Sequence, residues 1–144
     1  MSLKQLNILL VEDDEVDIMN VKRAFKKNKI NNPLHIARNG LEALAMLRGD
    51  AAAGVQKIEP TPKIILLDIN MPKMGGLEFL EIIRGDDALK SVSVFVMTTS
   101  DEESDKLAAF NLNVAGYILK PLSFERFVDA ISVLNHYWTL CELP

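Results

Sequence analysis

Carboxylate side chains come directly after two short apolar segments of the sequence. Glu12 and Asp13 succeed residues 8–11, and Asp68 succeeds residues 64–67. If these segments are neighbouring parallel strands, about 4.8 Å apart, the carboxylates of Asp13 and Asp68 converge within a few ångströms. Unaided, the two groups would repel and raise each other's pKa, and a bound cation would relieve that repulsion. Oxygen ligands with few protein donors suit Mg²⁺, so we predict a magnesium site here.

Two further polar residues are expected at the same place. Thr98 ends an apolar segment, and Lys120 directly follows another. Alone, Lys120 would be read as a solvated surface lysine, and Thr98 as a β-branched strand residue. Beside the acidic pocket, Lys120 is better placed to pair with an acid or with a bound anion, and the Thr98 hydroxyl to donate to that anion.

The elements that must position these residues alternate regularly along the chain. Apolar segments typical of strands buried on both faces occupy residues 6–11, 34–37, 64–67, 92–97 and 115–119. Amphipathic segments typical of helices occupy residues 15–28, 40–48, 76–84, 102–110 and 124–138. This alternation predicts an α/β fold with a doubly wound parallel sheet and right-handed crossovers. Such sheets bind ligands outside the carboxyl ends of their strands, where the carboxylates lie.

Local signals support these helices. Asp14 is expected to cap the first helix, with Asp17 nearby, and Ser123 the last; Asn39 with Glu42, and Ser100 with Glu103, have capping-box spacing. The last helix carries an apolar stripe expected to pack on the sheet, made of Phe124, Phe127, Val128, Ile131, Leu134 and Trp138. Residues 49–63 exceed a usual connection and are expected to form an exposed insertion.

Length and composition limit the class of protein. The 144 residues suit one domain, with a core at about residues 6–138 and a tail at residues 139–144, and no effector domain is expected. A net charge of −4 argues against nucleic-acid binding. The single cysteine, Cys141, and the absence of a signal peptide or a long apolar stretch predict a cytoplasmic protein outside the membrane.

Five motifs together resemble the receiver domain of response regulators in two-component signalling. They are Glu12-Asp13 after the first strand, the segment 67–72 with Gly75 and Gly76, Met97-Thr98, Tyr117, and the segment 118–121 that contains Lys120-Pro121. Their order and spacing match over about residues 6–138. The resemblance implies a flavodoxin-like (βα)5 sheet with strand order 2-1-3-4-5.

The resemblance also implies a role for each acidic residue. Asp68 would accept a phosphoryl group from a phosphohistidine of a sensor histidine kinase. Asp13, Asp68 and the backbone carbonyl of Asn70 would ligate Mg²⁺, and Glu12 would act mainly through metal-bound water. Phosphoryl transfer needs positioning and charge neutralisation, which such a site supplies.

The same resemblance implies three further roles. Thr98 and Lys120 would contact the phosphoryl oxygens, and a cis peptide would join Lys120 to Pro121. Tyr117 would be an aromatic switch that moves inward as Thr98 approaches the phosphoryl group. Gly75 departs from the family pattern, where Asp is frequent, and should leave the third helix with a weaker cap.

The end of the chain resembles that of response regulators paired with bacterial phytochromes, several of which are homodimers. Tyr137, Trp138 and Leu140 form an apolar terminus that we interpret as a candidate interface. The alternative is a tail folded back onto its own subunit. A basic group near the end of the first helix, made of Lys22, Arg23, Lys26, Lys27 and Lys29, is interpreted as a solvated face that complements the helix dipole, with kinase steering as the alternative.

Two other classes of protein compete with this signalling, non-enzymatic interpretation. A magnesium-dependent phosphatase with an aspartyl nucleophile would usually carry a second acid two residues later, where this chain has Asn70. A flavin-binding domain would need a phosphate-cradling loop after the first strand, where this chain has acids.

Overall fold

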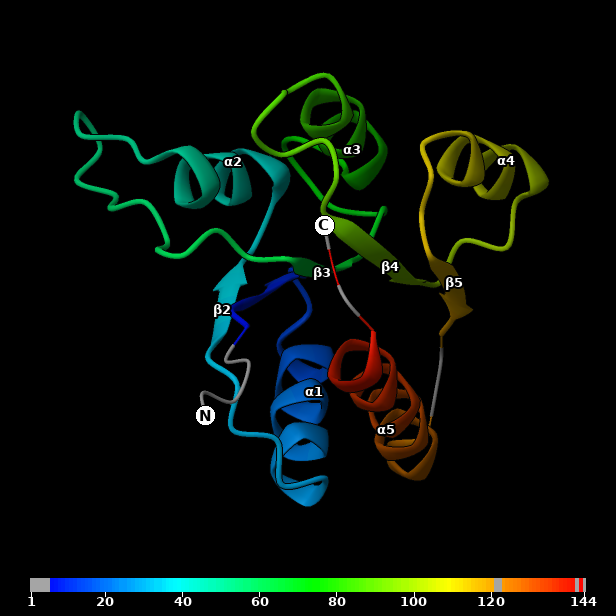
Figure 1. The fold of residues 1–144 in the computed structure, drawn as a ribbon. Coiled ribbons are helices and arrows are strands. Elements are labelled where there is room, and N and C mark those ends of the chain that lie inside the picture. Colours follow the sequence, from blue (N-terminus) through cyan, green and yellow to red (C-terminus); the bar gives the residue numbers. More distant parts are fainter. Residues whose placement is uncertain (1–5, 121–122, 142, 144) are drawn as a thin grey trace.

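A five-stranded parallel sheet forms the centre of the computed structural model, which describes residues 6–120, 123–141 and 143 (Figure 1). The strands are β1 (Ile8–Val11), β2 (Leu34–Ala37), β3 (Ile64–Leu67), β4 (Ser93–Thr98) and β5 (Gly116–Leu119). The helices between and after them are α1 (Glu15–Lys27), α2 (Gly40–Arg48), α3 (Gly76–Arg84), α4 (Glu103–Asn111) and α5 (Phe124–Leu140). The strand order is β2-β1-β3-β4-β5, so the predicted doubly wound fold is confirmed.

Helices cover both faces of the sheet. Figure 1 shows α1 and α5 together on one face and α2, α3 and α4 on the other. Because successive side chains of a strand point to opposite faces, Ile8 and Ile64 pack toward α1 and α5, whereas Leu9 and Ile65 pack in the opposite core. All four are fully buried, and they hold the sheet that positions the strand ends.

Helix α5 packs against α1 by its predicted apolar stripe. Phe127, Ile131, Leu134 and Trp138 are buried, and Phe124 and Val128 pack against them partly buried. The ring of Trp138 lies 6.2 Å from the ring of Phe25 in α1. The helix continues to Leu140, two residues beyond the predicted end, so the expected tail is partly helical.

The first strand is shorter than predicted, and asparagine side chains make hydrogen bonds in the segment before it. β1 begins at Ile8 rather than at Leu6. The carbonyl of Leu6 accepts from Asn32 Nδ2 at 3.0 Å, and Asn7 Nδ2 donates to the carbonyl of Pro60 at 2.7 Å. Residues 6 and 7 thus bind side-chain and loop partners, and the hydrogen bonds between β1 and its neighbouring strands begin after them. Apart from the end of α5, the other boundaries match the predictions or differ from them by one residue, and β4 includes Thr98.

The expected helix caps are confirmed at three of four places. Asp14 accepts from the backbone N–H groups of two residues of α1, Asn39 accepts from Glu42 and Ser123 accepts from Arg126. The prediction for Ser100 is wrong, because its hydroxyl donates to Asp105 Oδ2 at 2.6 Å and α4 begins two residues later than such a cap requires. Gly75 gives α3 no side-chain cap, as expected.

The long connection between α2 and β3 is only partly exposed, which corrects the prediction for residues 49–63. Residues 51–54 form an exposed turn, closed by a bridge between Asp50 and Val55. Ile58 and Pro62 are buried, and Ile58 joins the core on the α2 side of the sheet. One isolated isoleucine in a polar segment has no periodicity to reveal its burial. No helix among the described residues has both the length and the apolarity to cross a membrane.

Candidate functional site

Three carboxylates meet at the carboxyl ends of β1 and β3. One oxygen from each of Glu12, Asp13 and Asp68 lies within 4.8 Å of the others. Backbone hydrogen bonds fix this edge, since Glu12 N–H donates to the carbonyl of Ala37 at 2.9 Å and Asp68 N–H to that of Val11 at 3.0 Å. Glu12 and Asp68 are buried and Asp13 is exposed. The predicted convergence is confirmed, and the oxygen donors suit a hard divalent cation.

Lys120 reaches this cluster from the end of β5. Its Nζ lies 2.7 Å from Glu12 Oε1, 2.6 Å from Asp17 Oδ2 and 3.4 Å from Asp68 Oδ2. Its side chain is only 4% exposed, so the interpretation of Lys120 as a solvated surface residue is excluded. The predicted pairing with an acid is confirmed.

The charges of this cluster depend on each other. Burial raises the pKa of Glu12 to about 7, and Asp68 adds to the rise while Lys120 opposes it. Burial alone would lower the pKa of Lys120, but its hydrogen bonds to Asp17 and Glu12 outweigh that effect and raise the pKa above its ordinary value. Lys120 therefore stays charged, and it is the described cation nearest to the carboxylates.

Asp17 is the contact that sequence reasoning missed. It lies in the first turn of α1, and its N–H donates to the capping carboxylate of Asp14 at 3.1 Å. Asp13 precedes the N-cap Asp14 and lies outside the helix, so helical spacing from Asp13 does not place Asp17. The sequence alone marks Asp17 only as a neighbour of the cap.

Thr98 ends β4, the strand paired with β3, and Asn70 contacts Asp68 directly. Thr98 is completely buried, and its hydroxyl oxygen accepts from the N–H of Ser100 at 3.3 Å. Asn70 N–H donates to Asp68 Oδ1 at 3.0 Å, and its side-chain amide donates to Thr99 Oγ1 at 3.5 Å. One carboxylate oxygen of Asp68 thus receives a backbone donor while the other lies toward Lys120.

Tyr117 is connected to the end of β4 rather than to the carboxylates. Its hydroxyl donates to the carbonyl of Ser100 at 2.8 Å, and burial raises the pKa of this phenol. Phe110 of α4 lies beside its ring, with 6.3 Å between centroids. Tyr117 therefore links the segment after Thr98 to α4. The expected cis peptide of Lys120-Pro121 lies outside the described residues.

A glycine at the start of α3 lets the backbone beside Asp68 approach the helix. A Cβ at Gly76 would lie 2.5 Å from the carbonyl oxygen of Asp68 and 2.5 Å from the Cα of Ile69. The N–H of Gly76 donates to the carbonyl of Ile69 at 3.2 Å. Only glycine fits this contact, which fixes the backbone next to the carboxylate.

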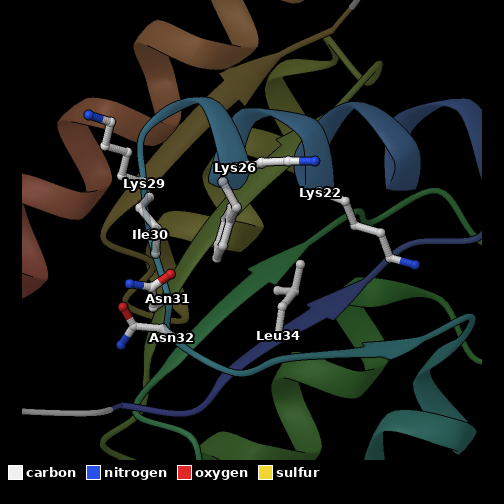
Figure 2. A pocket seen from close by; sticks show the side chains of 8 residues that line it. Lys22, Lys26, Lys29, Ile30, Asn31, Asn32 and Leu34 are labelled. Carbon is white, nitrogen blue, oxygen red and sulfur yellow. The ribbon is translucent and has the colours of Figure 1, made fainter.

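A separate concavity lies at the opposite end of α1. Its volume is about 450 Å³, and Figure 2 shows lysines from α1 and the turn after it beside residues that lead into β2. The lining is Lys22, Phe25, Lys26, Lys29, Ile30, Asn31, Asn32 and Leu34. Its lining begins at Lys22 in the middle of α1 and runs past the carboxyl end of this helix, whereas the carboxylates lie at the amino end. The basic group is thus distant from the acidic site, and its steering role stays a prediction.

The sequence matches the family of the response regulator receiver domain over residues 8–132. The chain therefore belongs to the response-regulator receiver domains, signalling modules of two-component systems that accept a phosphoryl group from a sensor histidine kinase. Receiver domains bind a divalent metal ion, which agrees with the oxygen donors of the acidic cluster.

Several relatives are similar to this chain over nearly all of its length. Response regulator Rcp1 from Synechocystis sp. is 36% identical over 131 residues, which are 91% of this chain and 87% of Rcp1. The crystal structure of its Mn²⁺-bound form has a TM-score of 0.83 at 34% identity and covers 96% of this chain and 99% of that one.

Two solved structures of phytochrome response regulators are also similar. The phosphorylated cyanobacterial phytochrome response regulator RcpA has a TM-score of 0.85 at 31% identity, covering 98% of this chain and 99% of that one. The bacteriophytochrome response regulator RtBRR has a TM-score of 0.75 at 38% identity, covering 98% of this chain and 85% of that one.

Proposed function

We propose that Asp68 is the residue that accepts the phosphoryl group. The observation that carries this proposal is the position of its carboxylate, which lies between two other acids and a buried ammonium group. A carboxylate oxygen of Asp68 would attack phosphorus, forming an O–P bond as the P–N bond to the kinase histidine breaks. The electron pair of that bond leaves with the imidazole nitrogen.

We propose Mg²⁺ as the cation of this site. Asp13, Asp68 and the backbone carbonyl of Asn70 would supply oxygen ligands, and Glu12, whose carboxylate lies in the same cluster, would act mainly through metal-bound water. When bound, the cation supplies charge neutralisation to the transferring group. The Mn²⁺-bound form of Rcp1 supports a divalent site, and the preference of Mg²⁺ for oxygen donors supports this choice.

Lys120 and Thr98 are proposed to bind the negatively charged oxygens of the phosphoryl group. Phosphorylation adds about −1.5 to −2 charges, and the Lys120 ammonium is already within 3.4 Å of Asp68. Thr98 would leave its contact with Ser100 N–H to donate to a phosphoryl oxygen. Because Tyr117 binds the carbonyl of Ser100, that movement would reach α4 and β5 and change the surface there.

The partners are proposed from the same comparisons. A sensor histidine kinase is the phosphoryl donor, and the similarity to RcpA and RtBRR supports a phytochrome as that kinase. We also propose a homodimer formed through the exposed stripe of α5, where Val133, Tyr137 and Leu140 lie at helical spacing. Trp138 is only 2% exposed, packs in its own core and is removed from the candidate interface.

Intact-mass measurement with acetyl phosphate or phosphoramidate and Mg²⁺ tests the site. We expect one phosphoryl group on the wild type and on Asp129→Asn, an exposed control on α5. Asp68→Asn should carry none, because an amide cannot form the acyl phosphate. A wild type that stays unlabelled, or a labelled Asp68→Asn, would reject the assignment. Steady turnover of phosphomonoesters would favour the phosphatase alternative instead.

A further inference from the structure

Asp17 makes the shortest contact of the buried ammonium group. Asp17 Oδ2 lies 2.6 Å from Lys120 Nζ, whereas Asp68 Oδ2 lies 3.4 Å from it. The lysine is thus drawn toward α1 more strongly than toward β3. Asp17 is held in the first turn of that helix, where the helix dipole favours a negative charge.

The donors of the ammonium group are already shared among its neighbours. A lysine side chain carries three N–H donors, and three carboxylates lie around this one. A phosphoryl group on Asp68 would need at least one of these donors. One of the present carboxylates must therefore give up part of its contact when the charge of the phosphoryl group arrives.

Asp17 differs from the other two acids in its position. Glu12 and Asp68 belong to the cluster whose oxygens lie within 4.8 Å of one another, and a cation bound there would compensate their charges. Asp17 stands outside that cluster, so its negative charge stays directed at Lys120. Asp17 Oδ2 and Asp68 Oδ2 contact the same Nζ, at 2.6 Å and 3.4 Å, so a phosphoryl group on Asp68 would lie near the Asp17 carboxylate and be repelled by it.

We propose that Asp17 is a positioning residue that holds Lys120 away from Asp68 and thereby limits the stability of the phosphorylated state. This inference rests on the proposed function of Asp68. Glu12, at 2.7 Å from Lys120 Nζ, keeps the lysine in the site when Asp17 is neutralised. Removing the charge of Asp17 should therefore release Lys120 toward the phosphoryl group without displacing it.

The test compares Asp17→Asn with the wild type at a subsaturating concentration of phosphoramidate and fixed Mg²⁺. We expect the ratio of phosphorylated to unphosphorylated chain at steady state to rise by roughly three- to tenfold, an effect reduced from the Coulomb limit by the partial exposure of Asp17. The affinity for beryllofluoride, measured by calorimetry, should rise in the same proportion.

Three variants separate this role from a structural one. Asp14→Asn, which removes a charge one turn away while keeping a good helix cap, should behave as the wild type. Asp17→Glu, which restores the charge, should return both readouts toward wild-type values. Asp17→Ser, a second neutral variant, should show the same rise in phosphorylated fraction and in beryllofluoride affinity as Asp17→Asn. Thermal unfolding checks that each variant is folded.

The outcomes are distinguishable from those for Asp68. An Asp17→Asn variant that is phosphorylated no more than the wild type, and binds beryllofluoride no more tightly, overturns this inference alone. An equal rise of the phosphorylated fraction in Asp14→Asn also overturns it. The rise would then follow from removing any negative charge near the site, and not from releasing Lys120. A wild type that accepts no phosphoryl group overturns the proposed function of Asp68, and this inference with it.

Discussion

Lys120 compensates carboxylates that come from three parts of the fold, namely the end of β1, the first turn of α1 and the end of β3. Its partners Glu12, Asp17 and Asp68 lie 108, 103 and 52 residues away in the sequence. Burial of so many charges is favourable only while each has a partner. The lysine is therefore a structural residue before any phosphoryl group arrives.

Replacing Lys120 by Met tests this structural role. Without Mg²⁺, we expect a loss of about 3 kcal/mol in the free energy of unfolding, because carboxylates are left buried without a counter-charge. Mg²⁺ should stabilise Lys120→Met more than it stabilises the wild type, since the cation takes over part of the neutralisation. Urea unfolding with and without Mg²⁺ measures both effects.

The control for this experiment is Lys106→Met, which removes surface ion pairs with Asp101 and Glu103. Exposed pairs contribute roughly 0 to 1 kcal/mol, so this variant should lose little and respond to Mg²⁺ as the wild type does. Equal Mg²⁺ stabilisation of Lys120→Met and the wild type would contradict the idea that lysine and cation share the same acids.

Single residues were predictable from the sequence where they stand at the ends of strands. Asp13, Asp68 and Lys120 each come just after a strand, and the register of the sheet brings strand ends together. Asp17 could not be placed in the same way, because its direction depends on where α1 begins. The cap expected at Ser100 failed because its hydroxyl has a competing acceptor in Asp105.

Among the elements, the start of α3 is the one most closely fitted to Asp68. Two adjacent glycines lie there, and they differ in whether the structure has room for a Cβ atom. A Cβ on Gly76 would collide with the backbone of residues 68 and 69, whereas a Cβ on Gly75 would meet nothing closer than 3.5 Å. Gly75 also has an ordinary backbone angle and provides no side-chain cap.

Substitutions at these two glycines should therefore change stability in opposite directions. Gly76→Ala should lower the free energy of unfolding by about 1 to 3 kcal/mol, because the backbone has to move to relieve the overlap. Gly75→Ser should raise it by roughly a few tenths of a kcal/mol, because the hydroxyl supplies a side-chain cap that glycine lacks. Urea unfolding of both variants gives the comparison, and a destabilising Gly75→Ser with a neutral Gly76→Ala would refute it.

Sequence patterns predict the ends of helices and strands less accurately than their centres. The centres of all ten elements were predictable, because apolar runs and helical stripes extend over several residues. Their ends are set by individual hydrogen bonds, such as that from Asn32 to the carbonyl of Leu6. The burial of Ile58 escaped prediction for a related reason, since it depends on where one loop crosses the edge of the core.

On the scale of the whole molecule, the βα alternation predicts a parallel sheet, and the family resemblance adds the strand order that the structure has. Exposed apolar side chains lie on several helices, and the most exposed of them belongs to α5. Leu140 is 82% exposed at the end of α5, and Val133 is exposed on the same side. The exposed stripe that these two residues form with Tyr137 is the basis of the proposed homodimer.

Leu140→Ser tests the dimer. If the stripe is the interface, the wild type should self-associate more strongly with beryllofluoride than without it, and Leu140→Ser should weaken that association by about tenfold or more, as expected when a buried leucine contact is lost. Sedimentation velocity measures the populations. Leu41→Ser, at an exposed leucine of α2, serves as the control.

A monomeric wild type under both conditions would remove the dimer from the proposal. Loss of association in Leu41→Ser as well would move the interface to another surface. The cytoplasmic location and the identity of the kinase stay predictions of the sequence and of its similarity to phytochrome response regulators.

The packing of Trp138 has a practical consequence for monitoring these changes in solution. The chain has one tryptophan, and its indole is buried between α1 and α5 with no hydrogen-bond partner for Nε1 among the described atoms. Its emission should accordingly be that of an indole in an apolar environment. Intrinsic fluorescence of the unlabelled protein is therefore a local optical signal of how tightly these two helices pack.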